Sequence, residues 1–335
     1  MFDHVAIVGA TGAVGQEFLK VIEKRKFPYK KLTLLASARS AGKQVEFRGE
    51  TLTVQELKED SFKDIDLALF SAGGSITKKF APIAVESGCV VVDNSSAFRM
   101  DPDTPLVIPE INPEDAKSHK GIIANPNCST IIMLMATFPI HRISPMRKIV
   151  VSTYQASSGA GAAAMEELRV QAREFLDGRA QDQLTMEAFP FPIAFNAFSH
   201  NSTMDPDDGY NMEETKMIKE THKILHDDSI AIAPTCIRIG TFRAHAESVH
   251  LELAGDVDLG AVREALNGFP GVTLIDDRQN NRFPMPLEAS DKDDVFVGRL
   301  RYSAGHNGNT LDLFCCGDQI LKGAALNAVQ IAELL

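Results

Sequence analysis

Near its N-terminus the chain reads Val5-Ala6-Ile7-Val8-Gly9-Ala10-Thr11-Gly12-Ala13-Val14-Gly15. The apolar residues before Gly9 predict a buried strand, and apolar residues at helical spacing after Gly15 predict a helix. Glycines in such a turn let the backbone approach a pyrophosphate at the helix N-terminus. The stretch therefore predicts a dinucleotide site at the start of a Rossmann-like domain, against the alternative of a tight turn without a ligand.

The residues after the second predicted strand favour one dinucleotide over the other. That strand, Leu32-Thr33-Leu34-Leu35, is followed by residues 36–43, which contain no Asp or Glu to bind a ribose 2′-hydroxyl. They contain Arg39 and the hydroxyls of Ser37 and Ser40 instead, which suit a 2′-phosphate. This pattern predicts NADP rather than NAD, with a solvated surface arginine as the alternative for Arg39.

Later segments predict two kinds of sheet. Near-continuous apolar runs at 66–70, 90–93 and 106–108 suit parallel strands buried on both faces. Longer strands then alternate with helices; the strands are expected at 148–155, 229–233, 248–253, 295–300 and 311–314, and the helices at 162–176, 212–225, 258–266 and 317–335. We predict an α/β protein with a Rossmann-like parallel-sheet NADP domain, residues 1–127 plus 318–335, and an α+β substrate domain with a mixed sheet, residues 128–317.

Composition excludes several classes of function. The chain has 335 residues, 44% of them hydrophobic, and a formal net charge of −11, which argues against a nucleic-acid or anionic-membrane partner. No apolar run approaches the roughly 20 residues that span a bilayer, and the first strand leaves no room for a signal peptide. Five cysteines, an odd number, suit a reducing cytoplasm. No Cys or His spacing predicts a metal site.

The stretch Asn125-Pro126-Asn127-Cys128-Ser129-Thr130 is a second focus of the prediction. Pro126 disfavours helix at Asn125, so a turn is expected there and Cys128 falls at the start of the following helix. The unpaired N–H groups and partial positive charge of that helix end favour a thiolate. Cys128 is therefore a candidate covalent nucleophile, and a buried structural cysteine is the alternative.

Several motifs together resemble aspartate-semialdehyde dehydrogenases over essentially the whole chain, in order. They include the glycine turn, the segment after the second strand and the Cys128 block, together with Phe98-Arg99-Met100-Asp101, Pro192-Ile193-Ala194-Phe195-Asn196, Glu213-Glu214-Thr215-Lys216, Arg243-Ala244-His245-Ala246-Glu247-Ser248 and the C-terminal residues 322–333. The resemblance implies reduction of L-aspartyl 4-phosphate by NADPH to L-aspartate 4-semialdehyde with release of phosphate. It also implies an acyl-thioester on Cys128, a place in aspartate-family amino-acid biosynthesis and a homodimer.

The resemblance assigns roles to particular residues. Cys128 is the nucleophile, His245 the acid/base and Gln155 orients the substrate; Arg238 binds the α-carboxylate, Glu213 lies near the α-amino group, and Lys216, Arg99 and Asn127 form the phosphate site. The expected cofactor residues are Gly9, Thr11, Gly12, Ala13, Val14, Ser37, Arg39, Ser40, Gly73, Ser158, Gly159 and Gln319. No metal is expected.

Three alternative functions are also compatible with the sequence: an N-acetyl-γ-glutamyl-phosphate reductase, an acyl-CoA reductase of similar fold, and a non-catalytic paralogue. The first usually has Gly-Cys where this chain has Asn127-Cys128, and the last should lack the cysteine or the histidine. The chain departs from the expected pattern at Arg238-Ile239-Gly240-Thr241-Phe242, where Arg-Val-Pro-Val is expected. Losing the proline there is expected to loosen this strand without changing the chemistry.

Overall fold

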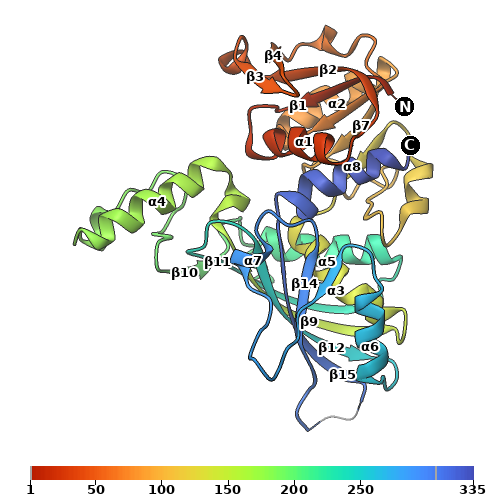
Figure 1. Ribbon diagram of the computed structural model, residues 1–335, viewed down its shortest axis with the longest axis vertical. Helices are drawn as coiled ribbons and strands as arrows, with labels where there is room; N and C mark the ends of the chain where they lie inside the picture. Colours follow the sequence, from red (N-terminus) through yellow and green to blue (C-terminus); the bar gives the residue numbers. More distant parts are fainter. Residues whose placement is uncertain (1, 306–307) are drawn as a thin grey trace. The chain divides into compact units, whose positions relative to one another are not determined.

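The computed structural model describes residues 2–305 and 308–335 (Figure 1). The chain divides into two compact units. The first contains the residues up to Asn127 together with Gly323–Leu335, and the second is Cys128–Lys322. The return to the first unit was expected at residue 318; residues 318–322 group with the second unit.

The first unit is built on a six-stranded sheet in which every neighbouring pair of strands is parallel. In sheet order the strands are β5 (Gln55–Glu56), β2 (Tyr29–Ala36), β1 (Phe2–Val8), β6 (Leu67–Phe70), β7 (Val90–Asp93) and β8 (Ile122–Ala124). The helices are α1 (Ala13–Lys24), α2 (Gly74–Glu86) and α8 (Leu326–Glu333). Figure 1 shows α8 beside α1, so the C-terminus completes a unit that the N-terminus begins. The predicted Rossmann-like parallel sheet is confirmed.

Two details of the first unit differ from the prediction. The antiparallel hairpin of β3 (Gln44–Phe47) and β4 (Glu50–Thr53) was not predicted. The strand predicted at 106–108 is wrong, because only Leu106 makes an isolated bridge, to Ala124. Prolines precede and follow this tripeptide, and a proline has no N–H to donate to a ladder. The tripeptide is apolar because it is buried in the core.

The second unit contains a seven-stranded mixed sheet. In sheet order its strands are β10 (Ala197–Ser199), β11 (Ala231–Ile239), β9 (Met146–Gln155), β12 (His245–Leu253), β15 (Thr310–Gly317), β14 (Val295–Tyr302) and β13 (Val272–Leu274). β9 and β11 run parallel, whereas β12 is antiparallel to β9. The predicted mixed sheet is confirmed.

Helices cover one face of this sheet. α3 (Cys128–His141) contacts four of its strands, and α5 (Met212–Leu225) and α6 (Leu259–Asn267) flank α3. α3 is apolar around its whole circumference, which suits a helix enclosed between a sheet and two further helices. The other helices are α4 (Ala162–Leu176) and α7 (Pro286–Ala289), with short 3₁₀ turns at Ala38–Ser40, Glu59–Phe62, Pro113–Ser118, Ser157–Ala160 and Gln181–Gln183.

The ends of several helices follow from local chemistry. The predicted bounds of α4 and α5 match the structure. The helix predicted at 258–266 is present as α6, and the Asp258 carboxylate caps it by accepting a hydrogen bond from the Ala261 N–H at 3.0 Å. The C-terminal helix was predicted to begin at Gly317, which is wrong. Gly317 ends β15, a π-helical turn occupies Leu321–Ala325, and α8 follows.

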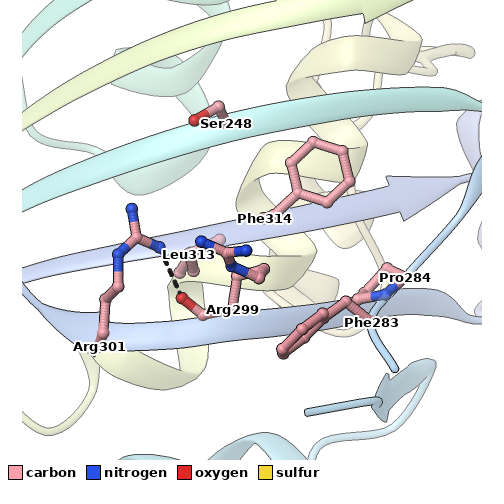
Figure 2. Close-up of a pocket in the computed structure, with 7 residues that line it drawn as sticks. All are labelled: Ser248, Phe283, Pro284, Arg299, Arg301, Leu313 and Phe314. Carbon is pink, nitrogen blue, oxygen red and sulfur yellow. Dashed lines mark hydrogen bonds between the residues drawn. The ribbon is translucent and has the colours of Figure 1, made fainter. Parts of the chain in front are cut away.

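The opposite face of the mixed sheet carries a groove of about 330 Å³. Figure 2 shows the side chains of Arg299, Arg301, Phe283 and Phe314 gathered on this face. The Arg299 guanidinium lies 5.1 Å from the centre of the Phe283 ring. Seven residues line the groove: Ser248, Phe283, Pro284, Arg299, Arg301, Leu313 and Phe314.

Among residues 2–305 and 308–335, no helix combines the length and the apolar character that crossing a membrane requires.

Candidate active site

Cys128 is the first residue of α3, as the sequence predicted. Its side chain is half-buried and forms no disulfide. Arg238 lies close enough to Cys128 for a negative charge on the sulfur to stabilise the guanidinium. A helix N-terminus and a buried cation both favour the thiolate over the thiol. The position therefore suits a nucleophile.

The topology of the mixed sheet brings three further candidate residues to one edge. Gln155 ends β9, and its partner in β11 is Arg238. Because β12 is antiparallel to β9, its first residue, His245, begins at the same edge. All three side chains are buried, with exposed fractions of 1% for Gln155, 4% for Arg238 and 0% for His245. Buried polar groups at one edge of a sheet are expected where a polar ligand binds.

The first turn of α5 supplies a carboxylate and an ammonium to this edge. The Asn211 side chain caps α5 by accepting hydrogen bonds from the N–H groups of Glu213 and Glu214, each at 3.0 Å. This cap fixes the backbone that carries Glu213. The Glu213 carboxylate accepts hydrogen bonds from Gln155 Nε2 and from Lys216 Nζ, both at 3.1 Å. Glu213 is 4% exposed, so the interaction with Lys216 is little screened by water.

Protein contacts already hold Arg238 in place. Its Nη1 donates to the carbonyl oxygen of Ala156 at 3.0 Å, and its Nε donates to Asn201 Oδ1 at 3.1 Å. Burial lowers the pKa of Arg238, and the nearby charges of Glu213 and Cys128 oppose that change. A guanidinium fixed by two bonds keeps Nη2 and the second hydrogen of Nη1 for an anionic ligand.

The hydrogen bonding of His245 determines which of its nitrogens carries the proton. The N–H of Ala156 donates to Nδ1 at 3.0 Å, so Nδ1 is an acceptor and the neutral ring carries its hydrogen on Nε2. Burial, followed by repulsion from Arg238, lowers the pKa of His245 well below its usual range. Nε2 is buried and has no partner among the described residues. His245 therefore presents an Nε2–H donor to whatever enters the site.

The turn after β9 lies against these groups. A Cβ atom at Gly159 would lie 2.9 Å from Arg238 Nη1 and 3.1 Å from Nε2 of His245, so only glycine fits without a shift. Gly159 and Ser158 belong to the 3₁₀ turn Ser157–Ala160. Gln319 Nε2 donates to Ser158 Oγ, which connects this turn to the residues that follow β15. The structure thus brings Ser158, Gly159 and Gln319 together, as the sequence suggested.

Buried Glu247 was not among the predicted site residues. It lies two residues after His245 on β12, and its neighbours across the sheet are Thr153 and Cys315. Neither carboxyl oxygen has a hydrogen-bond partner among the described residues. Burial, with a smaller contribution from Glu213, raises the pKa of Glu247 well above its usual range. The surroundings of this side chain therefore favour the neutral carboxylic acid over the carboxylate.

The first unit contains a cavity of about 290 Å³ at the carboxyl ends of its strands. Gly9 has a φ of +85°, and a Cβ there would lie 2.2 Å from the carbonyl oxygen of Ser71. A Cβ at Gly15 would lie 2.2 Å from the carbonyl oxygen of Gly9. These two glycines let strand, turn and helix pack closely enough for a pyrophosphate to reach the helix N-terminus. Ten residues line the cavity: Gly9, Thr11, Gly12, Ala36, Ser37, Leu57, Ser71, Ala72, Ile76 and Phe80.

The other predicted cofactor residues surround this cavity or border its strands. Ala13 and Val14 begin α1, and Gly73 precedes α2 with a φ of +86°. Thr11 Oγ1 donates to Ser40 Oγ at 3.2 Å, which joins the glycine turn to the segment after β2. Arg39 lies in that segment with an exposed side chain. Apolar walls of the cavity are formed by Leu57, Ile76 and Phe80. None of these three was among the predicted cofactor residues.

Arg99 and Asn127 belong to the first unit, whereas the other substrate residues belong to the second. Arg99 is 7% exposed, and its guanidinium donates to the carbonyl oxygens of Asn125, at 2.9 Å, and Asn94, at 2.8 Å. Asn127 is 6% exposed and directly precedes Cys128. Arg99 is thus tied to the chain segment that leads into α3.

Two family models match the chain: "Semialdehyde dehydrogenase, NAD binding domain" over residues 4–119 and "Semialdehyde dehydrogenase, dimerisation domain" over residues 138–322. An aspartate-semialdehyde dehydrogenase of Synechocystis sp. is 53% identical over 332 residues, covering 99% of this chain and 97% of the relative. The chain belongs to the aspartate-semialdehyde dehydrogenase family. The resemblance found in the sequence is confirmed, and the family makes the chain an oxidoreductase of amino-acid biosynthesis with an NAD(P)-binding domain.

Other members of the aspartate-semialdehyde dehydrogenase family also match this chain over nearly their full length. The Aquifex aeolicus protein of that name is 52% identical, covering 99% of this chain and 97% of its own. A crystal structure of aspartate semialdehyde dehydrogenase II from Vibrio cholerae superposes with a TM-score of 0.95 at 45% identity, covering 100% of this chain and 98% of that chain. A second structure of that Vibrio cholerae enzyme is described as complexed with ASA.

The structure explains why this family member tolerates glycine where proline was expected. The N–H of Gly240 donates to the carbonyl oxygen of Asn196 at 3.2 Å, a bond that proline cannot make. A Cβ at Gly240 would also lie 2.7 Å from the carbonyl oxygen of Ile193. The close approach of residues 193–196 therefore requires glycine. β11 stays regular to Ile239, so the loosening expected from the lost proline is wrong.

Sequence reasoning missed three polar residues beside Arg238 and Glu213. Asn201 holds Arg238 Nε, and Ser202 Oγ accepts a hydrogen bond from the Glu213 N–H at 3.2 Å. His200 lies beside Arg238 and Glu213, whose charges act on its ring. The sequence carries no motif for these residues, and the short strand β10 that they follow was not predicted.

Proposed function

We propose that the chain catalyses the NADPH-dependent reductive dephosphorylation of L-aspartyl 4-phosphate to L-aspartate 4-semialdehyde. The observation that carries this proposal is the convergence of Gln155, Arg238 and His245 on one edge of the mixed sheet, with Arg238 electrostatically coupled to Cys128. An anion-binding arginine beside a nucleophilic thiol and a hydrogen-bond donor suits a substrate that carries a carboxylate and an activated acyl group.

In the proposed reaction the Cys128 thiolate attacks the acyl carbon of the substrate. A C–S bond forms, the C–O bond to phosphate breaks, and inorganic phosphate leaves with the electron pair. Arg99, Asn127 and Lys216 are the proposed phosphate residues, and two of them are cations that stabilise this leaving group. When bound, NADPH would supply the hydride that reduces the resulting thioester. Protonation of the oxygen would give a hemithioacetal, and loss of that proton with breaking of the C–S bond would release the aldehyde and restore the Cys128 thiolate.

His245 is proposed to hold a proton at the reacting oxygen. The bond from Ala156 N–H to Nδ1 leaves Nε2–H as the donor, and Nε2 has no partner among the described residues. A donor in this position stabilises negative charge on the carbonyl oxygen while the carbon is attacked or reduced. Its lowered pKa makes the neutral ring the resting form at pH 7.

The remaining groups are proposed to orient the amino-acid end of the substrate. Arg238 offers Nη1 and Nη2 hydrogens to the α-carboxylate, and Glu213 offers negative charge to the α-ammonium. Gln155 holds Glu213 through its Nε2 at 3.1 Å, so it fixes the carboxylate that the ammonium meets. Such fixed partners reduce the entropy cost of positioning the acyl carbon over Cys128.

The test is the reverse reaction, in which NADP reduction is followed with L-aspartate 4-semialdehyde and inorganic phosphate. We expect activity that requires phosphate. Activity with an N-acetylated, longer aldehyde and none with L-aspartate 4-semialdehyde would transfer the assignment to an N-acetyl-γ-glutamyl-phosphate reductase. A phosphate-independent reaction that requires coenzyme A would favour an acyl-CoA reductase. No turnover with any aldehyde would favour a non-catalytic role.

We propose NADP rather than NAD as the cofactor, in the cavity of the first unit. The glycines at positions 9 and 15 let strand, turn and helix pack closely, as a pyrophosphate site requires, and Ser37, Arg39 and Ser40 supply donors for a 2′-phosphate. Ser158, Gly159 and Gln319 of the second unit are the proposed contacts of the nicotinamide end. These residues fit the cofactor without any metal.

Arg39→Ala tests this preference. We expect the KM for NADP to rise by roughly 10- to 100-fold, because a charge-assisted pair with a phosphate is lost. The KM for NAD should change less than about twofold, since NAD has no 2′-phosphate. Lys31→Ala is the matched control, because it removes one exposed cation near the opposite end of β2. Equal changes of KM for both cofactors would rule out the proposed role of Arg39.

We propose that two copies of the chain associate through the open face of the mixed sheet. The match to a dimerisation-domain family covers this sheet from residue 138, and arginine and aromatic side chains gather in the groove of Figure 2. Arg and aromatic residues are enriched in protein interfaces, where they provide most of the binding energy. The groove is thus the proposed centre of a homodimer contact.

Phe314→Arg tests the proposed dimer contact, because it adds a third cation beside Arg299 and Arg301 in the groove. We expect wild-type chains to sediment at twice the 36.5 kDa of one copy and the variant to sediment as single copies. Leu176→Ser is the control, because it changes an exposed apolar residue on α4 without touching the groove. A variant that remains dimeric would place the contact elsewhere.

A cytoplasmic location is proposed as well. All five cysteines lie in the described residues, and none forms a disulfide. This is typical of a reducing compartment.

A further inference from the structure

His200 follows the short strand β10, beside the proposed carboxylate site. Its N–H donates to the carbonyl oxygen of Cys236 at 3.0 Å, which ties it to β11 two residues before Arg238. The next residue, Asn201, accepts the Arg238 Nε hydrogen bond. His200 is therefore positioned by the same strand pair that positions the arginine.

The hydrogen bonds of His200 determine its tautomer. The N–H of Ser202 donates to Nδ1 at 3.1 Å, and Ser202 Oγ lies 3.0 Å from the same nitrogen. A ring nitrogen that accepts an N–H bond carries no hydrogen, so the neutral ring carries its hydrogen on Nε2. Burial, followed by repulsion from Arg238, lowers the pKa of His200 to about 4, and the ring is neutral at pH 7.

The Nε2 atom of His200 is buried and has no hydrogen-bond partner in the part of the chain that the structure describes. A buried donor without a partner destabilises the fold, so such groups are usually explained by a ligand or a functional role. The charged groups that act on His200 are Arg238, Glu213 and Lys216. Arg238 and Lys216 are donors only. The Glu213 carboxylate, which accepts from Gln155 and Lys216, accepts no hydrogen bond from His200 Nε2. A ligand oxygen would supply the acceptor.

We propose that the Nε2–H of His200 is a substrate-binding donor that completes the α-carboxylate site together with Arg238. This inference rests on the proposed function. The Arg238 Nε and one hydrogen of Nη1 are used by Asn201 and Ala156, so the arginine cannot present its side-on fork to the substrate. A carboxylate has two oxygens and about four acceptor positions. Arg238 leaves some of these positions without a donor, and the Nε2–H of His200 is a second donor for them.

The test compares His200→Phe and His200→Gln with wild type, using L-aspartate 4-semialdehyde and 3-aminopropanal, the equivalent aldehyde without a carboxylate. For His200→Phe we expect the KM for L-aspartate 4-semialdehyde to rise roughly tenfold or more, with kcat changed less than about threefold. The preference in kcat/KM for the carboxylate-bearing aldehyde should fall by the same factor. A glutamine amide places an N–H near the position of Nε2, so His200→Gln should recover most of that preference.

A merely structural role would give a different pattern. If His200→Phe lowers kcat/KM equally for both aldehydes, or if His200→Gln does not restore the preference, the substrate contact is overturned. Thermal unfolding and NADP titration of both variants check that the fold and the cofactor site are intact. Wild-type protein that shows no phosphate-dependent activity would overturn the proposed function and this inference together. Active wild type with an unchanged KM in His200→Phe would overturn this inference alone.

Discussion

Cys128→Ser is expected to lose turnover by a factor of at least ~10⁴ while binding NADPH as wild type does. A serine hydroxyl is not ionised near pH 7, and the helix N-terminus and Arg238 that favour a thiolate cannot make it so. The proposed cofactor cavity is lined only by residues of the first unit, so the substitution leaves it unchanged. Steady-state kinetics in the reverse direction and a fluorescence titration with NADPH measure the two properties.

Alkylation with iodoacetamide provides the control, because it compares Cys128 with the other four cysteines. Burial raises the pKa of the thiols of Cys89, Cys236, Cys315 and Cys316, so these four stay protonated and unreactive. Mass spectrometry should find one adduct, on Cys128, at the stage when activity disappears. Normal turnover in Cys128→Ser, or inactivation by an adduct on another cysteine, would remove the covalent mechanism.

Glu247→Gln is expected to make the protein more stable than wild type at pH 7.5 and equally stable near pH 4.5. The folded-state pKa of Glu247 is raised, so above the unfolded value of 4.5 the folded chain keeps a proton that the unfolded chain releases. The free energy of unfolding of wild type therefore falls as pH rises, by about 1.4 kcal/mol per pH unit from this group alone. Glutamine has the same shape and does not ionise, so the stability difference between the two proteins should grow as pH rises above 4.5.

The measurement is the free energy of unfolding of both proteins in urea at several pH values. Glu252→Gln is the matched control on the same strand, because Glu252 is half-exposed and paired with Lys148 at 3.0 Å. Its effect should stay within about 1 kcal/mol at every pH. A stability difference for Glu247→Gln that does not grow with pH would show that Glu247 is ionised in the folded protein.

The elements with strong local signals were predicted well from the sequence. The helices α4 and α5 match their predicted bounds, and Cys128 begins α3 as the proline two residues earlier suggested. The predicted strand at 106–108 failed because burial, rather than strand pairing, makes those residues apolar. The C-terminal helix was predicted to begin too early: Gly317 is the last residue of β15, and the helical residues begin with the π-helical turn at Leu321.

The residues of the site could be predicted only where they belong to a recognisable sequence motif. Cys128, Arg238 and His245 could be assigned from the family resemblance, and the sheet register brings Arg238 and His245 to one edge. His200 and Asn201 could not, because their positions depend on the antiparallel pairing of the three-residue strand β10 with β11. Glu247 could not either, because the strand predicted at 248–253 did not reach it, whereas β12 begins at His245.

The return of α8 to the first unit has a consequence for how the protein is made. α8 packs against α1, β6 and β7, and Asn327 Nδ2 donates to the carbonyl oxygen of Val107 at 3.0 Å and to Asn125 Oδ1 at 2.7 Å. A ribosome delivers these partners before the second unit and α8 after it. The first unit therefore cannot finish folding until α8 has been made, and the inserted second unit can fold before it.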